Sequence, residues 1–424
     1  MAFLQDVFSS LLDQRRIFKS EKDKRNISEL CASLMSEQGE VSGTKVASAV
    51  LAKYEALEAE EKAQFFSELV SLYDLDVEDV IDAAQSYAGS KSRAALERLT
   101  QVSEPKRQEL FRRLNQVPGS TEKLVHMRED LFPMLKAHPE YAVIDSDFED
   151  LFDTWFNRGF LLLQPIDWRT PANILEKIIE YEAVHAINDW DDLRRRLQPT
   201  DRRCFGFFHP VMPEEPLIFV EVALTKGVPS SIESLLTDQR EELSDGDADT
   251  AVFYSISNCQ NGLRGVSFGN FLIKQVAGDL SASLPNIKNF VTLSPVPGFS
   301  RWLAKQELSD ENADLVRVLN ADVISIEMIQ PHQKSLMRLM AQYMTQAKRN
   351  DGFPVDPVSR FHLGNGASLA QINWMADLSE NGLKQSLGMM VNYRYALPSV
   401  ESNHESYVKE QQVHAAKEVL VLAK

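Results

Sequence analysis

Apolar residues recur at helical spacing through the N-terminal part of the chain. Two stripes show the pattern most clearly: Leu4, Val7, Phe8 and Leu11, and then Phe65, Leu69, Leu72 and Tyr73. Turn signals such as Pro118-Gly119 separate the helical stretches, and no β-rich run interrupts them. The pattern predicts an all-helical bundle over residues 1–155, and its simplest interpretation is a domain for interaction or oligomerisation.

After Trp155 the pattern changes to short apolar runs that alternate with helical stretches. Thr170-Pro171 is typical of a helix start, with a capping hydroxyl followed by Pro. Strands are predicted at Cys204–His209, Leu217–Leu224, Ala251–Ser257 and Asn289–Leu293. The acidic, Gly-containing residues 238–249 predict a surface loop. The predicted fold class is multidomain α and α/β (α+β), and we expect the chemistry in a second domain, residues 156–424.

The composition is that of an ordered globular protein with an acidic balance. The 424 residues are 44% hydrophobic and 25% charged, and 62 acidic against 45 basic residues give a formal net charge of −17. Net acidity disfavours nucleic acid as a partner, because Lys and Arg supply most of the affinity for phosphate backbones. The three cysteines, Cys31, Cys204 and Cys259, have no metal-ligand spacing, so neither a zinc site nor a disulfide framework is expected.

No targeting or membrane signal stands out in the sequence. No apolar run approaches the roughly 18 residues that a membrane span needs, so no membrane is expected as a partner. Asp6 and Asp13 argue against a transit peptide, and the last residues, Leu422 to Lys424, are not a peroxisomal address. The expected location is therefore the cytoplasm.

The densest chemical signal is a Gly-rich turn between two predicted strands. Residues 264–270 read Arg-Gly-Val-Ser-Phe-Gly-Asn, and the helix that follows has the apolar stripe Phe268, Phe271, Leu272, Val276 and Leu280. Backbone N–H groups at the start of a helix are good donors for phosphate, and glycine lets the ligand approach closely. An acidic protein can bind an anionic ligand in this way.

Three interpretations of this turn stay open on the residues alone. Gly265 to Gly269 matches G-x-S-x-G, the nucleophile elbow of α/β-hydrolases, although that elbow follows its strand directly and mostly polar residues intervene here. Arg264 to Asn270 is also similar to the pyrophosphate loop of GNAT acyltransferases, R-G-x-G-x-G/A, with Ser267 in place of the central glycine. A purely structural Gly-rich turn is the third interpretation.

Two single residues and one basic cluster also have both a structural and a chemical interpretation. Ser294 precedes Pro295 at the end of a predicted strand, where a serine is either a turn residue or a reactive group facing a crevice. His362 lies just before two glycines, so its imidazole belongs either to the core or to a cleft. The basic cluster, read as a solvated helix face or as a phosphate contact, consists of Arg194, Arg195, Arg196, Arg202 and Arg203.

Taken together, these segments resemble the malonyl-CoA decarboxylase family. The most specific of them are VFYSISNCQNGLRGVSFGNFLIK (252–274), NFVTLSPVPGFSRWL (289–303), RFHLGNGASLAQINWMAD (360–377) and VNYRYAL (391–397). The resemblance spans about residues 150 to 400, and the helical half matches mainly in character. It implies a helical oligomerisation domain, a GNAT-like catalytic domain with a mixed central sheet, and a homotetramer. The implied reaction converts malonyl-CoA to acetyl-CoA and CO2 without a metal or organic cofactor.

The resemblance also assigns roles to individual residues. The malonyl-CoA-binding loop would consist of Arg264, Gly265, Val266, Ser267, Phe268, Gly269 and Asn270. Ser294 would be the catalytic serine, His362 the catalytic histidine that donates a proton to carbon, and both would also contact the substrate. Tyr395, in NYRY, would be a supporting active-site residue. Mammalian members have Glu where this chain has Ser267, so the role of that carboxylate does not carry over.

Other functions remain as alternatives. A GNAT-type acyltransferase would need an added acceptor, and an acyl-CoA thioesterase with Ser267 as nucleophile would release CoA and malonate. A non-catalytic oligomeric scaffold is suggested only by the helical half.

The proton donation expected of His362 assumes that its pKa is that of an ordinary histidine, near neutrality.

Overall fold

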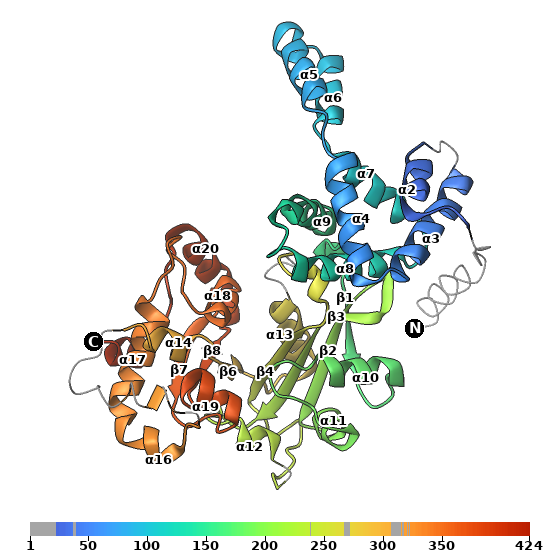
Figure 1. The fold of residues 1–424 in the computed structure, drawn as a ribbon. Coiled ribbons are helices and arrows are strands. Elements are labelled where there is room, and N and C mark those ends of the chain that lie inside the picture. The colour runs from blue at the N-terminus through green and yellow to red at the C-terminus, as the bar shows by residue number, and fades with distance from the viewer. Residues whose placement is uncertain are drawn as a thin grey trace. The chain divides into compact units, whose positions relative to one another are not determined.

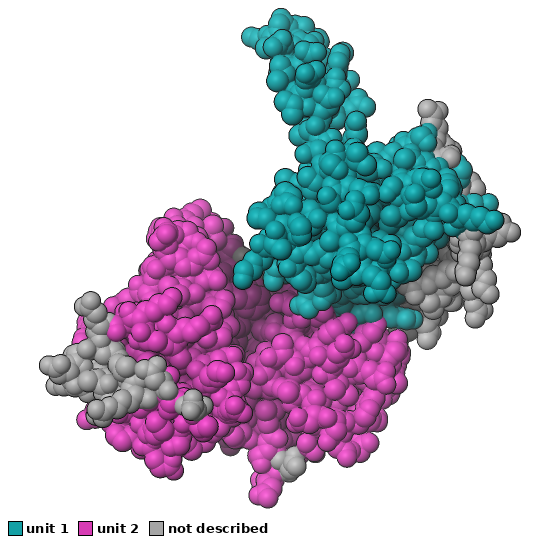
Figure 2. Space-filling model, viewed as in Figure 1, with its two compact units in different colours: residues 1–162, 208–216, 260–268 teal, residues 163–207, 217–259, 269–424 magenta. Residues whose placement is uncertain are grey.

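The computed structural model describes residues 23–36, 40–237, 239–266, 272–306, 315, 318–319, 321 and 323–424. These residues form two compact units, drawn in different colours in Figure 2. Unit 1 takes the chain up to residue 162 together with 208–216 and 260–268, and unit 2 takes the remainder. Two short segments from the second half of the chain therefore belong to the helical unit.

Unit 1 is built from helices, as the hydrophobic pattern predicts. They are α2 (Ile27–Ser36), α3 (Glu40–Glu55), α4 (Ala59–Leu72), α5 (Val77–Ser90), α6 (Arg93–Val102), α7 (Lys106–Leu114), α8 (Ser120–Leu131) and α9 (Ala142–Trp155), with the short turns η1 (Phe132–Met134), η2 (Pro139–Tyr141), η3 (Arg158–Phe160) and η4 (Asn261–Leu263). Polar residues start several of these helices: the Asp76 side chain accepts from two backbone N–H groups of α5, and Ser92 caps α6.

The α5–α6 hairpin projects from the rest of unit 1 (Figure 1). This explains why one predicted core stripe is only half correct. Phe65 and Leu69 of α4 are buried, whereas Leu72, at the end of α4 where the hairpin departs, is 63% exposed. The stripe at residues 4–11 lies outside the described residues.

Unit 2 contains most of the sheet and the remaining helices. Its strands are β1 (Leu162–Ile166), β2 (Arg202–His209), β3 (Met212–Thr225), β4 (Thr250–Asn258), β5 (Asn289–Thr292), β6 (Ser294–Pro295), β7 (Ser368–Asn373) and β8 (Met390–Arg394). Its longer helices are α10 (Ala172–Tyr181), α11 (Trp190–Leu197), α13 (Leu272–Ser283), α17 (Gln333–Gln346), α18 (Pro357–Gly364), α19 (Glu380–Ser386) and α20 (Val400–Glu410). Shorter pieces are α12 (Glu233–Leu236), α14 (Phe299–Leu303), α16 (Ile326–Ile329), η6 (Gln330–His332), η7 (Leu397–Ser399) and α21 (Lys417–Leu422).

The sheet is mixed, and in the described part of the chain it has eight strands in the order β1-β2-β3-β4-β5-β8-β6, with β7 paired to β8. The four predicted strands are confirmed as β2, β3, β4 and β5; their ends shift by one or two residues, except that β3 already begins at Met212 rather than Leu217. Strands β3 and β4 are antiparallel, β4 and β5 are parallel, and β5 and β8 are antiparallel. The parallel pair is connected through α13, since a crossover between parallel strands needs a connection of a dozen or more residues. A helical region followed by a domain with a mixed sheet confirms the predicted fold class, multidomain α and α/β (α+β).

Strand β4 is the centre of the domain. Its first residues are buried on both faces and pack with Val291 and Leu293 in one core cluster. Pairing with β5 covers only Thr250 to Phe253, although β4 continues to Asn258. The last part of β4 therefore has β3 on one side and no ladder partner from β5 on the other.

Gly262, in the turn η4, lies directly against the backbone of α8. A Cβ built on Gly262 would stand 2.0 Å from the carbonyl oxygen of Val125. Arg128 of α8 donates from Nη1 to the carbonyl oxygens of Gly262 (3.1 Å) and Arg264 (2.9 Å), which fixes the turn on the helix. The close approach at this position therefore requires glycine.

We expect Gly262→Ala to lower the free energy of unfolding by about 1–3 kcal/mol, the usual cost of overpacking. Gly89→Ala is the matched control, because Gly89 lies within helix α5 and a Cβ there meets nothing within 4 Å; it should be neutral or stabilise by about 0.5–1 kcal/mol. Urea unfolding of both variants measures this. Equal stability of the two variants would contradict the packing described here.

Candidate active site

Ser294 lies at the point where β5 ends and β6 begins. Strand β6 pairs with β8, and Ser294 lies opposite Val391 on that neighbouring strand. Its hydroxyl is buried and donates to Oγ1 of Thr292 at 2.8 Å. Pro295 follows, which removes the next backbone donor and ends the pairing there. The structure thus places the predicted catalytic serine at a strand end.

His362 lies in the last turn of α18, and the sequence explains why that helix begins where it does. Asp356 is the N-cap, its Oδ1 accepting from the backbone N–H of Ser359 at 2.9 Å, and Pro357 occupies the first helical turn. Asp356 is itself buried and also accepts from the hydroxyl of Tyr343 at 3.3 Å. This anchored start holds the register of α18, and hence the position of His362.

The three predicted catalytic residues come together in unit 2 as one hydrogen-bonded chain. Ser294 Oγ lies 3.1 Å from His362 Nε2, and His362 Nδ1 lies 2.8 Å from the hydroxyl of Tyr395. The imidazole also stacks on the ring of Tyr393, with ring centroids 4.5 Å apart. All four residues are buried. The imidazole is therefore fixed through both nitrogens and one ring face.

Burial sets the charge of this chain. The loss of hydration lowers the pKa of His362 to about 3, and burial raises the pKa of Tyr395 well above its ordinary value. Both groups are neutral at physiological pH in the substrate-free protein. Desolvation therefore overturns the expectation that His362 has a pKa near neutrality.

Ser294 and His362 face a cavity of about 250 Å³ in unit 2. The cavity lies where β4 separates from β5, between the last part of β4, strand β6 and α18. Its lining consists of Val184, Phe253, Tyr254, Ile256, Asn258, Ser294, Pro295, Pro357, Val358, Phe361 and His362. None of these lining residues is Lys, Arg, Asp or Glu. The side chains of Ser294 and His362 therefore face a mainly apolar, uncharged space.

The part of β4 that lines the cavity contains a β-bulge. The register with β3 pairs Glu221 with Ser255 and Val222 with Phe253, so Tyr254 is an extra residue, a β-bulge. Beyond the bulge, alternate backbone N–H groups point away from β3, towards the side that β5 has left. Such N–H groups can donate hydrogen bonds to an anionic oxygen of a ligand.

The predicted substrate loop is described only in part. Arg264, Gly265 and Val266 lie in unit 1, where the guanidinium of Arg264 stacks over Phe132 at 4.2 Å and Gly265 has φ +92°. Ser267, Phe268, Gly269 and Asn270 lie outside the described residues, so the loop assignment stays a prediction. Strand β4 ends at Asn258 and the turn η4 intervenes before Gly265, so the strand-to-turn junction of a nucleophile elbow is not present here.

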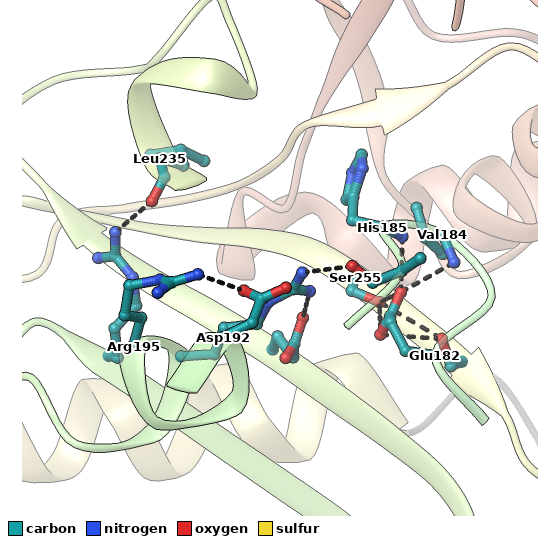
Figure 3. A network of polar contacts seen from close by, with 12 residues as sticks. Glu182, Val184, His185, Asp192, Arg195, Leu235 and Ser255 are labelled. Carbon is teal, nitrogen blue, oxygen red and sulfur yellow. Dashed lines mark hydrogen bonds and ion pairs between the residues drawn. The ribbon is translucent and has the colours of Figure 1, made fainter. Parts of the chain in front are cut away.

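The arginines of the basic cluster form hydrogen bonds and ion pairs with other residues of this chain (Figure 3). Arg196 donates to Glu221 (3.1 Å) and to the carbonyl of Ala186 (3.0 Å), and Arg202 donates to the carbonyl of Leu235 (2.6 Å). The more exposed members pair with Asp191, Asp192 and Asp245. This network supports the structural interpretation of the cluster rather than a phosphate site.

A second buried network anchors the cavity wall at Val184. The carboxylate of Glu182 accepts from Ser255 Oγ at 2.7 Å and from the backbone N–H groups of Val184 and His185 at 2.8 Å (Figure 3). The segment after α10 is thereby tied to β4. Sequence reasoning did not single out Glu182, and it also passed over Thr292 and Tyr393. For Thr292 and Tyr393 the available signal was their position two residues before Ser294 and Tyr395, because residues two apart in an extended chain share one face.

The described residues show neither a metal-binding cluster nor a membrane-spanning helix. Among them, no group of three or more His, Cys, Asp and Glu side chains is arranged to hold a metal ion. Within the same residues, no helix has the length and apolarity needed to cross a membrane.

A helical unit, and a mixed-sheet unit that holds a buried Ser–His pair at a cavity, are typical of an enzyme. The family model for the malonyl-CoA decarboxylase C-terminal domain matches residues 159–424, and the model for the N-terminal domain matches residues 73–156. The chain therefore belongs to the malonyl-CoA decarboxylase family.

Individual relatives agree with this assignment. The mitochondrial malonyl-CoA decarboxylase of Anser anser anser is 39% identical over 74% of this chain and 69% of its own length, and that of Rattus norvegicus is 33% identical over 86% and 82%. The crystal structure of malonyl-CoA decarboxylase from Rhodopseudomonas palustris is 48% identical, with a TM-score of 0.89 over 93% of this chain and 98% of that one. The enzyme from Agrobacterium vitis is 47% identical, with the same TM-score over 94% and 100%.

The imidazole of His362 should stay neutral from about pH 5 to about pH 8 in the substrate-free protein, because its lowered pKa lies below that range. Nitrogen-15 NMR of histidine-labelled protein measures this, and His362→Gln assigns the signal by its disappearance. A His362 signal that titrates with a midpoint near pH 6.5 would contradict the buried, desolvated site.

Proposed function

We propose that this enzyme converts malonyl-CoA to acetyl-CoA and CO2 in the cavity between β4 and α18. The observation that carries the proposal is the chain from Ser294 through His362 to Tyr395, which faces an uncharged cavity in a member of the malonyl-CoA decarboxylase family. The malonyl group would enter the cavity with its carboxylate towards the Ser–His pair. The cavity wall at β4 would receive the thioester.

The thioester supplies the electron sink for this reaction. When the C–C bond breaks, its electron pair moves into the thioester carbonyl and gives an enolate, so we propose that no metal or organic cofactor takes part. The alternate N–H groups of β4 beyond the Tyr254 bulge are suited to stabilise the enolate oxygen. They belong to a rigid central strand, and this preorganisation makes such donors effective.

The apolar lining favours loss of the carboxylate charge. A malonate carboxylate that enters this cavity exchanges water for side chains such as Phe253, Ile256 and Phe361, and no cation among the lining residues offsets that loss. Loss of CO2 transfers the negative charge to the enolate, which the backbone donors stabilise. Desolvation of the carboxylate therefore lowers the barrier relative to water.

His362 handles the proton that the reaction consumes. Malonyl-CoA carries one carboxylate charge more than acetyl-CoA, so each turnover takes up one proton from solvent. Loss of CO2 leaves the negative charge on an enolate beside His362, which raises the pKa of His362, so the imidazole takes up that proton at this stage. After CO2 leaves, the proton passes to the α-carbon, directly or through the hydroxyl of Ser294, and His362 returns to its neutral state.

The same proposal includes roles for the substrate loop and for the two domains. Residues 264–270 would bind the CoA part of the substrate, residues 1–155 would serve assembly into a homotetramer, and residues 156–424 would carry catalysis. The helical half supports this with apolar residues at the exposed surface of the α5–α6 region, including Val77 and Ile81. A cytoplasmic location stays a prediction; the relatives from goose and rat are named as mitochondrial.

Product analysis separates decarboxylation from its alternatives. Incubation with malonyl-CoA alone, followed by mass spectrometry, should give acetyl-CoA and CO2. A hydrolase would give CoA and malonate, an outcome that a serine 3.1 Å from a histidine makes worth testing. An acyltransferase would leave malonyl-CoA unchanged until an acceptor is added.

We expect Ser294→Ala and His362→Asn each to lower kcat by at least about 10²-fold, the usual scale for loss of a key donor or general acid. Release of CO2 at saturating malonyl-CoA is the assay. Ser300→Ala and His332→Asn are matched controls, since neither residue is in the cavity lining, and both should keep normal turnover. Near-normal kcat in a folded Ser294 or His362 variant would refute the assignment.

A further inference from the structure

Thr292 is the buried residue that receives the hydroxyl hydrogen of Ser294. It is fully buried at the end of β5, and its Oγ1 accepts from two donors: the hydroxyl of Ser294 at 2.8 Å and the backbone N–H of Tyr393 at 3.1 Å. The carbonyl of Thr292 in turn accepts from Nδ2 of Asn392 at 2.7 Å. Thr292 is therefore tied to β8 through both its side chain and its backbone.

This arrangement determines which hydrogens His362 carries. Because the hydrogen of Ser294 points to Thr292, the contact between Ser294 Oγ and His362 Nε2 needs a hydrogen on Nε2. A neutral imidazole has only one such hydrogen, so Nδ1 must accept, and Tyr395 donates to it. Each residue of this hydrogen-bonded series then donates to the next: Tyr395 to His362, His362 to Ser294, and Ser294 to Thr292.

We propose that Thr292 is a positioning residue, whose Oγ1 holds the Ser294 hydroxyl and thereby keeps His362 in the tautomer with its hydrogen on Nε2. In this tautomer an N–H donor, rather than a lone pair, faces the side of the cavity where a carboxylate binds. The opposite tautomer would present a lone pair to an anion, which is repulsive. The effect on catalysis rests on the proposed decarboxylation at this site, whereas the tautomer itself does not.

Two substitutions at Thr292 separate hydrogen bonding from packing. Thr292→Val keeps the shape but removes the acceptor, so the Ser294 hydroxyl should turn to Nε2 and His362 should move its hydrogen to Nδ1. Thr292→Ser keeps the acceptor and loses only a methyl group. Thr250→Val is the matched control, because Thr250 is also a fully buried threonine, on β4, whose hydroxyl donates to Asp249 rather than to the site.

The measurement is nitrogen-15 NMR of the His362 imidazole, combined with steady-state kinetics. The wild type, Thr292→Ser and Thr250→Val should show the hydrogen on Nε2, and Thr292→Val should show it on Nδ1. Thr292→Val should also lose about 10²-fold in kcat, the scale of a misplaced catalytic group, while Thr292→Ser stays within about 3-fold of the wild type.

Several results would overturn the proposal. A wild-type His362 with its hydrogen on Nδ1 does so without any variant. An unchanged tautomer in Thr292→Val does so as well, and if Thr292→Ser is as impaired as Thr292→Val, the residue acts through packing. If the tautomer switches as expected but the wild type yields no acetyl-CoA, the positioning role stands and the proposed function fails.

Discussion

The separation of β4 from β5 after Phe253 is the constraint on which this site depends. Parallel pairing covers only four residues of β4, and the strand then continues with a bulge at Tyr254. The resulting gap is closed by α18 and by the segment that Glu182 ties to β4, which leaves a cavity lined on one side by backbone and on the other by His362. A fully paired β4 and β5 would leave no room for a substrate.

Neutrality is the second property that unites the site. The lining residues of the cavity carry no carboxylate, Lys or Arg, and burial keeps His362 and Tyr395 uncharged. Two neutral groups in an apolar space are a suitable environment for a reaction in which a carboxylate leaves as neutral CO2. The charge of −17 on the whole chain has little bearing on this chemistry, because the local environment of the cavity decides it.

The sequence predicted the elements that depend on local patterns and missed those that depend on tertiary context. The apolar runs of β2 to β5 were readable, whereas β7 and β8 contain polar residues such as Asn373 and Asn392, which bond to each other, and Asn392 also bonds to Thr292, far along the chain. Leu72 follows the helical period, yet it is exposed because the α5–α6 hairpin leaves the bundle there. Ser294, His362 and Tyr395 were found through family resemblance; their residue contexts alone left structural alternatives open. The pKa of His362 and the role of Thr292 depend on burial and rotamers, which no single-sequence pattern encodes.

The most direct test is a crystal structure of the Ser294→Ala variant with malonyl-CoA bound. We expect the malonyl carboxylate to lie in the cavity between β4 and α18, within hydrogen-bond distance of Nε2 of His362, with the thioester oxygen on the backbone N–H groups beyond Tyr254. A malonyl group bound outside this cavity, or a carboxylate paired with Lys or Arg, would contradict it.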